Sequence, residues 1–267
     1  MIRTYGRAPY RVVVVHGGPG ALGSMARVAR ELSRFAGVAE PLQSKFDIAG
    51  LIEELKDQIG RVCTRPVTLI GHAWGAWLGS LYAAAYPEDV TQLVLVSCAP
   101  LDVRYSGQIM EQRRKRMTQG EWALFNGLLF RLDRVPPDSR NWLLEQLGAL
   151  LDKTDHYDLL PNGEDGLGQM PVNGEMYLSI WPEAEALCES GELLRQLRKI
   201  QCPVHVIHGE HDPRPAEGVT VPLHANNIGF KRHLLPLCGH EPFRERHAAA
   251  AFYTILENII RNEPRRG

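Results

Sequence analysis

The sequence predicts an α/β fold: a mostly parallel sheet with helices on both faces and a helical insertion. Short β-branched runs alternate with helical segments over the first hundred residues, and the alternation resumes near residue 189. Between these two parts, helical patterns follow one another without an apolar β-branched run. Alternating strands and helices are typical of parallel sheets, so the helical stretch is an insertion into an α/β frame.

The first part of the frame contains three strands and three helices. The strands are apolar, rich in Val, Leu and Ile, and end at glycines or at a polar turn, as buried parallel strands do. The second helix begins behind an Asp47 N-cap and places its apolar residues on one face. Strands are predicted at 11–18, 66–72 and 90–100, and helices at 23–35, 47–59 and 74–86.

The remaining elements divide the chain into a core and a lid. Residues 1–100 and 189–267 are predicted to form the α/β core, and residues 101–188 a helical lid. Within the lid, helical patterns lie at 107–117, 120–133 and 139–153. In the late core, strands followed by loops are predicted at 203–212 and 231–240, and helices at 191–200, 215–227 and 241–262.

The bulk composition excludes several classes of partner. The chain has 267 residues and a net charge of −1 from 30 basic and 31 acidic residues. Without a basic field we expect neither nucleic acid nor an anionic membrane as partner. Five scattered cysteines without a C-x-x-C pair favour reduced thiols. The valine run at 12–15 is too short for a signal peptide or a membrane span, so the predicted location is cytoplasmic.

Two glycine-rich turns follow predicted strands. HGGPG at 16–20 lets the backbone turn sharply and leaves amides facing a cleft, as an oxyanion site requires. GHAWG at 71–75 has the spacing and context of the G-x-S-x-G turn that presents a nucleophilic serine. Its central residue is Ala73, which has no atom able to attack. Taken singly, each turn also fits a plain glycine bend.

A carboxylate and a histidine follow the two late strands. Asp212 ends VHVIHGEHD and His240 ends LLPLCGH. Singly, Asp212 could cap a turn and His240 could begin a helix. Together, in this order after the nucleophile position, they are the acid and base that activate a serine. Catalytic groups gather at the carboxyl edge of open α/β sheets, so we expect both residues near Ala73.

These motifs resemble those of α/β-hydrolases of the proline-iminopeptidase-like branch, which carry HGGPG, a G-x-S-x-G turn, a Gly-x-x-Asp and a Gly-His. The resemblance covers nearly the whole chain and implies the α/β-hydrolase fold with a lid. It also implies that Asp212 is the triad acid, His240 the base, and the amides of Gly18 and Trp74 the oxyanion hole. Two features depart from it. The nucleophile maps onto Ala73, and only fifteen residues precede HGGPG, so we expect a shortened N-terminal hairpin.

Two interpretations of Ala73 remain open. In the first, alanine replaces a serine, which leaves the fold intact and inactivates a serine hydrolase. In the second, the chain is a natural non-catalytic protein that binds a small ligand under the lid. The completeness of HGGPG, Asp212 and His240 favours the first, because these groups have a clear purpose only beside a nucleophile.

The substrate class follows only from the resemblance, which implies a small molecule or short peptide. An N-terminal aminoacyl amide is implied by the branch, while esters and lactones stay open because HGGPG also occurs in esterases. An aminopeptidase needs a carboxylate for the α-ammonium group, and Glu175, Glu183 and Glu185 are candidates, although each also fits a solvated helix start. Trp181, as an aromatic wall, and His16 are further candidate contacts.

No cofactor and no metal are predicted, and the oligomeric state stays open. The sequence has no G-x-G-x-x-G after a strand and no phosphate loop. His205 and His208 lie three apart on a strand and point to opposite faces, so they cannot easily share an ion. Cys98 and Cys238 lie off the nucleophile turn and fit buried thiols.

Overall fold

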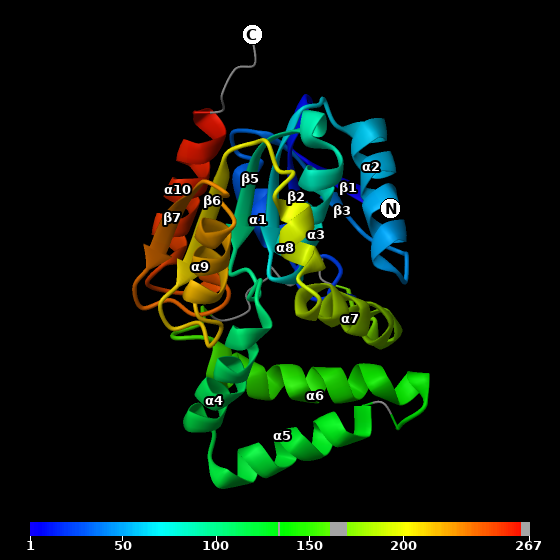
Figure 1. The fold of residues 1–267 in the computed structure, drawn as a ribbon, viewed down its shortest axis with the longest axis vertical. Coiled ribbons are helices and arrows are strands. Elements are labelled where there is room, and N and C mark those ends of the chain that lie inside the picture. Colours follow the sequence, from blue (N-terminus) through cyan, green and yellow to red (C-terminus); the bar gives the residue numbers. More distant parts are fainter. Residues whose placement is uncertain (133, 161–169, 263–267) are drawn as a thin grey trace.

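A seven-stranded sheet lies between two layers of helices in the computed structural model, which describes residues 1–132, 134–160 and 170–262 (Figure 1). The strand order is β1-β3-β2-β4-β5-β6-β7. β1 pairs antiparallel with β3, and every other neighbouring pair is parallel, which confirms the predicted fold class. The strands are β1 Ile2–Tyr5, β2 Tyr10–Val15, β3 Gly37–Pro41, β4 Val67–His72, β5 Val90–Val96, β6 Val204–Gly209 and β7 Phe230–Leu235.

Both faces of the sheet are covered by helices, and the valines of β2 show why its sequence is continuously apolar. Val13 and Val15 pack in one apolar cluster with α2, α3, α8 and α9, whereas Val12 and Val14 pack in the other with α1 and α10. The helices of the frame are α1 Ala26–Leu32, α2 Ile48–Val62, α3 Trp74–Ala85, α8 Glu192–Leu197, α9 Glu217–Ala225 and α10 Ala249–Arg261.

The start of α2 follows the sequence prediction. The Asp47 carboxylate accepts a hydrogen bond from the Gly50 amide at 2.7 Å and caps the helix. Ile48, Leu51 and Leu55, from the predicted apolar face, are buried, while the opposite face is open to solvent.

Two strands have no counterpart in the sequence prediction. β1 pairs with β3 rather than with β2. The consecutive strands β1 and β2 therefore do not form a hairpin with each other. β3 lies between β1 and β2 and is buried along its whole length, although it contains a glycine, a proline and Glu40. The Glu40 carboxylate is held there by the Tyr5 hydroxyl, which donates to it at 2.6 Å. Because Glu40 interrupts the run of apolar residues, the sequence of β3 does not show the apolar pattern by which a buried strand is predicted.

The last predicted helix begins later than expected. Residues 241–248 precede α10, which starts at Ala249, so the prediction of a helix from 241 was wrong over this stretch. The Glu245 carboxylate explains the difference. It accepts hydrogen bonds from the amides of Tyr157, Asp158 and Gly239, and this requires an irregular backbone around it.

In the described part of the segment between β5 and α8, the α-helices have two different packing partners. α4 Ser106–Arg116, α5 Gln119–Leu132 and α6 Pro137–Asp155 share an apolar cluster of their own, and α5 and α6 lie beyond the lower end of the sheet in Figure 1. α7 Gly174–Glu189 instead buries Met176, Ile180 and Ala184 in the cluster that contains α3. α7 therefore joins the predicted lid segment to the frame.

Two further observations bear on the chain as a whole. Cys63, Cys98, Cys188, Cys202 and Cys238 are free thiols. Among the described helices, none combines the length and apolar character needed to cross a bilayer.

The cap of α2 allows a direct test of the fold. We expect Asp47→Ala to lower the free energy of unfolding by about 1 kcal/mol, because the Gly50 amide loses its acceptor. Asp57→Ala, on the exposed face of the same helix, should change it by less than about 0.5 kcal/mol. Chemical denaturation measures both, and equal effects of the two changes would contradict the capping role.

Candidate active site

A cavity of about 330 Å³ lies at the carboxyl ends of the parallel strands. From the frame it is lined by residues that follow the ends of strands, among them Gly18, Ala73 and His240. From the segment between β5 and α8, Arg113, Leu151, Tyr177 and Trp181 line it. The site predicted from the sequence and the lid segment therefore meet at one concave space.

The turn between β4 and α3 holds Ala73 in a strained backbone conformation with a positive φ. Its φ is 49° and its ψ −110°, and its amide donates to Val96 O at 2.9 Å. A Cβ on Gly71 would lie 2.1 Å from Gly75 O, and one on Gly75 would lie 2.5 Å from Val15 O. The two flanking glycines are thus required by close backbone contact, and the turn has the form that presents a side chain to the cavity.

The structure brings Asp212 and His240 together. Nδ1 of His240 donates to Asp212 Oδ2 at 2.7 Å, so Nε2 is the basic nitrogen of the ring. The second Asp212 oxygen accepts from the Arg214 amide at 3.0 Å and from the Arg214 guanidinium at 3.3 Å. Both residues are buried, and His240 lines the cavity beside Ala73. This pair can orient a base toward whatever occupies position 73.

The electrostatics keep this base neutral and its acid ionised. Burial lowers the pKa of His240, and the positive charge of Arg214 lowers it further against the opposing pull of Asp212. Burial by itself would raise the pKa of Asp212, but the hydrogen bond from His240 and the positive charge of Arg214 hold it well below its usual range. A neutral imidazole beside a carboxylate is the state that accepts a proton.

His72 connects the end of β4 to the loop that carries the base. Its Nε2 donates to the backbone carbonyl of His240 at 3.0 Å, and the two rings lie 4.8 Å apart. Burial lowers the pKa of His72 well below its usual value, so the ring stays neutral. A Cβ on Gly17 would lie 2.6 Å from His72 Nδ1. The first glycine of HGGPG therefore makes room for the ring that holds His240.

Gly18 and Trp74, the residues predicted to supply the oxyanion amides, both line the same cavity. Gly18 has a φ of 51°, which glycine adopts without strain, and Trp74 is the first residue of α3. Neither amide donates a hydrogen bond within the described part of the chain. Farther along the turn, Gly20 lies against α7: a Cβ there would meet Asn173 O at 2.3 Å. Free amides at a turn and at a helix start are suited to holding an oxyanion.

Of the three predicted substrate contacts, only Trp181 lines the cavity. His16 is fully buried and lies outside the lining, with Nδ1 donating to Gly17 O at 3.0 Å. Glu183 is also outside it, because its carboxylate accepts from the Ile48 amide at 2.9 Å and so caps α2 from α7. The structure thus places both His16 and Glu183 away from the cavity lining. Glu185 accepts instead from the Trp181 indole at 2.8 Å.

Three charged residues of the site were not found from the sequence. Arg113 of α4 and Arg214 both line the cavity, and both donate to the buried carboxylate of Asp155 at the end of α6. The Asp155 backbone carbonyl accepts from the His240 amide at 2.8 Å. The one local feature of the sequence that could have pointed to Arg214 is its position two residues after Asp212. Arg113 lies in a run of basic residues that resembles a solvated helix.

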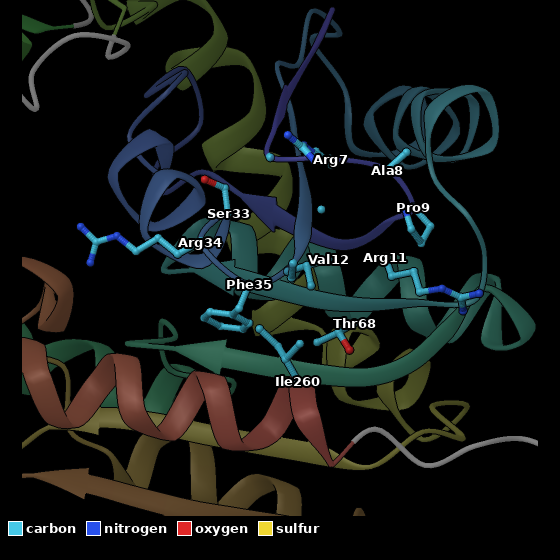
Figure 2. Close-up of a pocket in the computed structure, with 13 residues that line it drawn as sticks. Arg7, Ala8, Pro9, Arg11, Val12, Ser33, Arg34, Phe35, Thr68 and Ile260 are labelled. Carbon is cyan, nitrogen blue, oxygen red and sulfur yellow. The ribbon is translucent and has the colours of Figure 1, made fainter.

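A larger cavity of about 640 Å³ lies at the opposite edge of the sheet, where β2, β3 and β4 begin. Figure 2 shows the side chains of Arg11 and Arg34 extending in opposite directions at its rim. Arg34 is also paired with Glu31 at 2.6 Å. Because Arg11 and Arg34 point away from each other, they do not form a joint binding site for one ligand in the larger cavity. The smaller cavity at the carboxyl edge is therefore the better candidate site.

The described part of the chain contains no cluster of side chains suited to metal binding. No group of three or more His, Cys, Asp or Glu side chains there is placed to hold an ion. His205 lies beside His233 of the neighbouring strand, with 3.5 Å between ring nitrogens, and His208 donates to Arg214 O at 2.8 Å.

Comparisons with known proteins agree with this architecture. A family model described as "Alpha/beta hydrolase family" matches residues 12–252. A curated 2-succinyl-6-hydroxy-2,4-cyclohexadiene-1-carboxylate synthase from Enterobacter sp. (strain 638) is 24% identical over 195 residues, which are 72% of this chain and 66% of that protein. The match thus spans just under two thirds of the relative's length.

Two solved structures are similar along nearly the whole chain. An esterase from Exiguobacterium antarcticum superposes with a TM-score of 0.69 at 16% identity, covering 98% of this chain and 95% of that chain. A proline iminopeptidase from Mycobacterium smegmatis has a TM-score of 0.64 at 16% identity, with coverage of 98% and 94%. At these identities the likeness concerns the fold.

The glycines of α3 provide a matched test of the turn. We expect Gly75→Ala to lower the free energy of unfolding by at least about 2 kcal/mol, since its Cβ would meet the carbonyl oxygens of Val15 and His16 at 2.5 Å. For Gly79→Ala, one turn later, the nearest atoms belong to the side chains of Leu69 and Leu93, at 3.4 and 3.6 Å, so the change should be neutral or stabilising by up to about 1 kcal/mol. Thermal and chemical denaturation measure both; similar stabilities would refute the close contact.

The pKa of His240 is a second test. We expect its imidazole to titrate below 6.5 in an NMR titration of the full chain, because burial and Arg214 disfavour the charged ring. Asp212→Asn should lower the pKa further, since the carboxylate favours the imidazolium. Asp57→Asn on the exposed face of α2 serves as the control. A His240 pKa at or above 6.5, or an upward shift in the Asp212 variant, would contradict this electrostatic description.

Proposed function

Because the chain belongs to the alpha/beta hydrolase family, we propose that its cavity is a serine-type acyl-hydrolase site in which Ala73 stands at the nucleophile's position. The observation that carries the proposal is the 2.7 Å contact between His240 and Asp212, at the cavity that the strained Ala73 turn also lines. A base, its orienting acid and a nucleophile turn have a joint chemical purpose.

The reaction follows from these positions once a serine stands at 73. His240 Nε2 takes the hydroxyl proton while Asp212 holds the ring, and the serine oxygen attacks the acyl carbon. The amides of Gly18 and Trp74 stabilise the oxyanion, the leaving group departs with the proton, and water then releases the acyl-enzyme by the same steps. With Ala73 no acyl-enzyme forms, so the Ala73 chain binds substrate without turning it over.

The charges at the cavity favour an ester over an N-terminal aminoacyl amide. An α-ammonium group would meet the guanidinium groups of Arg113 and Arg214, which line the cavity. None of the three carboxylates proposed to receive it, Glu175, Glu183 and Glu185, lines the cavity; Glu183 caps α2 and Glu185 accepts from the Trp181 indole. A small-molecule ester therefore fits the site better than a peptide N-terminus.

A natural non-catalytic binding protein is the second candidate, and Ala73 itself is the observation that favours it. In that case the same cavity holds a small ligand, and His240 and Asp212 serve binding and stability. Restoring a serine would then produce no turnover, which separates the two functions.

Ala73→Ser tests the proposal. We expect the variant to hydrolyse p-nitrophenyl esters at least about 10³-fold faster than the Ala73 chain, since a triad serine raises the rate by several orders of magnitude. Prolyl p-nitroanilide should be a poor substrate for it. A fluorophosphonate probe should label the serine variant and leave the Ala73 chain unlabelled.

A matched variant assigns the activity to this site. His240→Gln in the Ala73→Ser background should return ester hydrolysis to the level of the Ala73 chain, because the base is lost. A folded Ala73→Ser protein that neither turns over an ester nor takes the label would refute the acyl-hydrolase proposal and leave the binding protein standing.

A further inference from the structure

Two arginines line the cavity from opposite parts of the chain. Arg113 comes from α4, and Arg214 follows the acid Asp212 after β6. Their side chains are 11% and 17% exposed, so both are largely removed from solvent although they border the cavity. Both positive charges also act on Tyr177, another lining residue, whose pKa is raised by burial and by Glu185 and lowered in part by these arginines.

Each guanidinium keeps unused donors. Arg113 spends Nε and Nη2 on the Asp155 carboxylate, at 2.9 and 2.5 Å, and its Nη1 makes no hydrogen bond with the described part of the chain. Arg214 donates through Nη1 to Asp155 at 3.0 Å and to Asp212 at 3.3 Å, while its Nε and Nη2 have no acceptor in the same residues. A guanidinium carries five N–H donors, so both groups can bind a further anion.

The nearby carboxylates are already occupied. Asp155 is shared by the two arginines, and Asp212 also holds His240. Glu241, which lines the same cavity, is paired with Arg244. No carboxylate of this wall is left to satisfy the free donors, so an anion from outside would meet them with little competition.

We propose that Arg113 and Arg214 bind a carboxylate group of the substrate, so that the substrate class is acyl compounds that carry a second, anionic carboxylate. Guanidinium groups match carboxylates in geometry and charge, and such hydrogen bonds are stronger where water is restricted. The stacked rings of Tyr177 and Trp181, with centroids 6.0 Å apart and an interplanar angle of 6°, provide an apolar surface for the substrate's carbon chain. This inference rests on the proposed acyl-hydrolase function.

The test compares two esters of equal chain length in the Ala73→Ser protein. Mono-p-nitrophenyl glutarate carries the distal carboxylate, and p-nitrophenyl valerate carries a methyl group in its place. We expect kcat/KM to be at least about 10-fold higher for the glutarate ester, and the difference to shrink as salt is added. Equal kcat/KM values, or a preference for valerate, would overturn the anion site while leaving the acyl hydrolase intact.

Variants distinguish binding of the carboxylate from a general structural role. Arg113→Gln should lower kcat/KM for the glutarate ester by at least about 10-fold more than for the valerate ester. A purely structural arginine would lower both equally, which would count against the proposal. Arg114→Gln, at the exposed neighbouring position of α4, should alter neither. Arg113→Lys, which keeps the charge beside Asp155, should show a smaller loss of the same selectivity and serves where the glutamine variant does not fold.

A binding measurement on the Ala73 chain separates this inference from the proposed function. Monomethyl glutarate and methyl valerate report the same chemical contrast without cleavage, and saturation-transfer NMR gives both affinities. We expect the glutarate ester to bind at least about 10-fold more tightly. If it binds no better than the valerate ester, the anion site is wrong, whatever the serine variant does.

Discussion

The buried carboxylate of Asp155 is the contact on which the geometry of the cavity depends. Its oxygens accept from Arg113 of α4 and from Arg214, and its backbone carbonyl accepts from the His240 amide. One residue at the end of α6 thereby joins the inserted helices, the acid loop and the base loop. A buried charge is costly unless it is paired and hydrogen-bonded, so these parts cannot separate without leaving an uncompensated ion.

Close backbone contacts form the second constraint. Gly75 leaves no space for a Cβ because the end of β2 lies against the start of α3, and Gly20 leaves none because Asn173 lies against HGGPG. The HGGPG turn, the GHAWG turn and α7 are therefore held together by main-chain atoms. Such contacts do not depend on the side chain at position 73. They explain why Ala73 keeps a strained φ of 49° although it has no serine hydroxyl.

The electrostatics of the site combine a neutral base with two arginines that line the cavity and are paired with buried carboxylates. Burial and Arg214 lower the pKa of His240, while Arg214 and His240 together keep Asp212 ionised. The same arginine thus holds the acid in its charged form and disfavours protonation of the base. A ligand that brings a negative charge to these arginines would offset part of that repulsion, so binding and base strength are coupled through Arg214.

The sequence by itself determined the α/β fold class, the cap of α2 at Asp47 and the separate motifs that carry Ala73, Asp212 and His240, because each of these depends on a pattern of residues near one another in the chain. Tertiary structure alone decided the burial of β3, whose Glu40 accepts a hydrogen bond from Tyr5 of another strand. It also decided that Arg113 and Asp155, 42 residues apart, form an ion pair at the cavity. Pairings between distant segments leave no local pattern, since each partner alone resembles an ordinary surface residue.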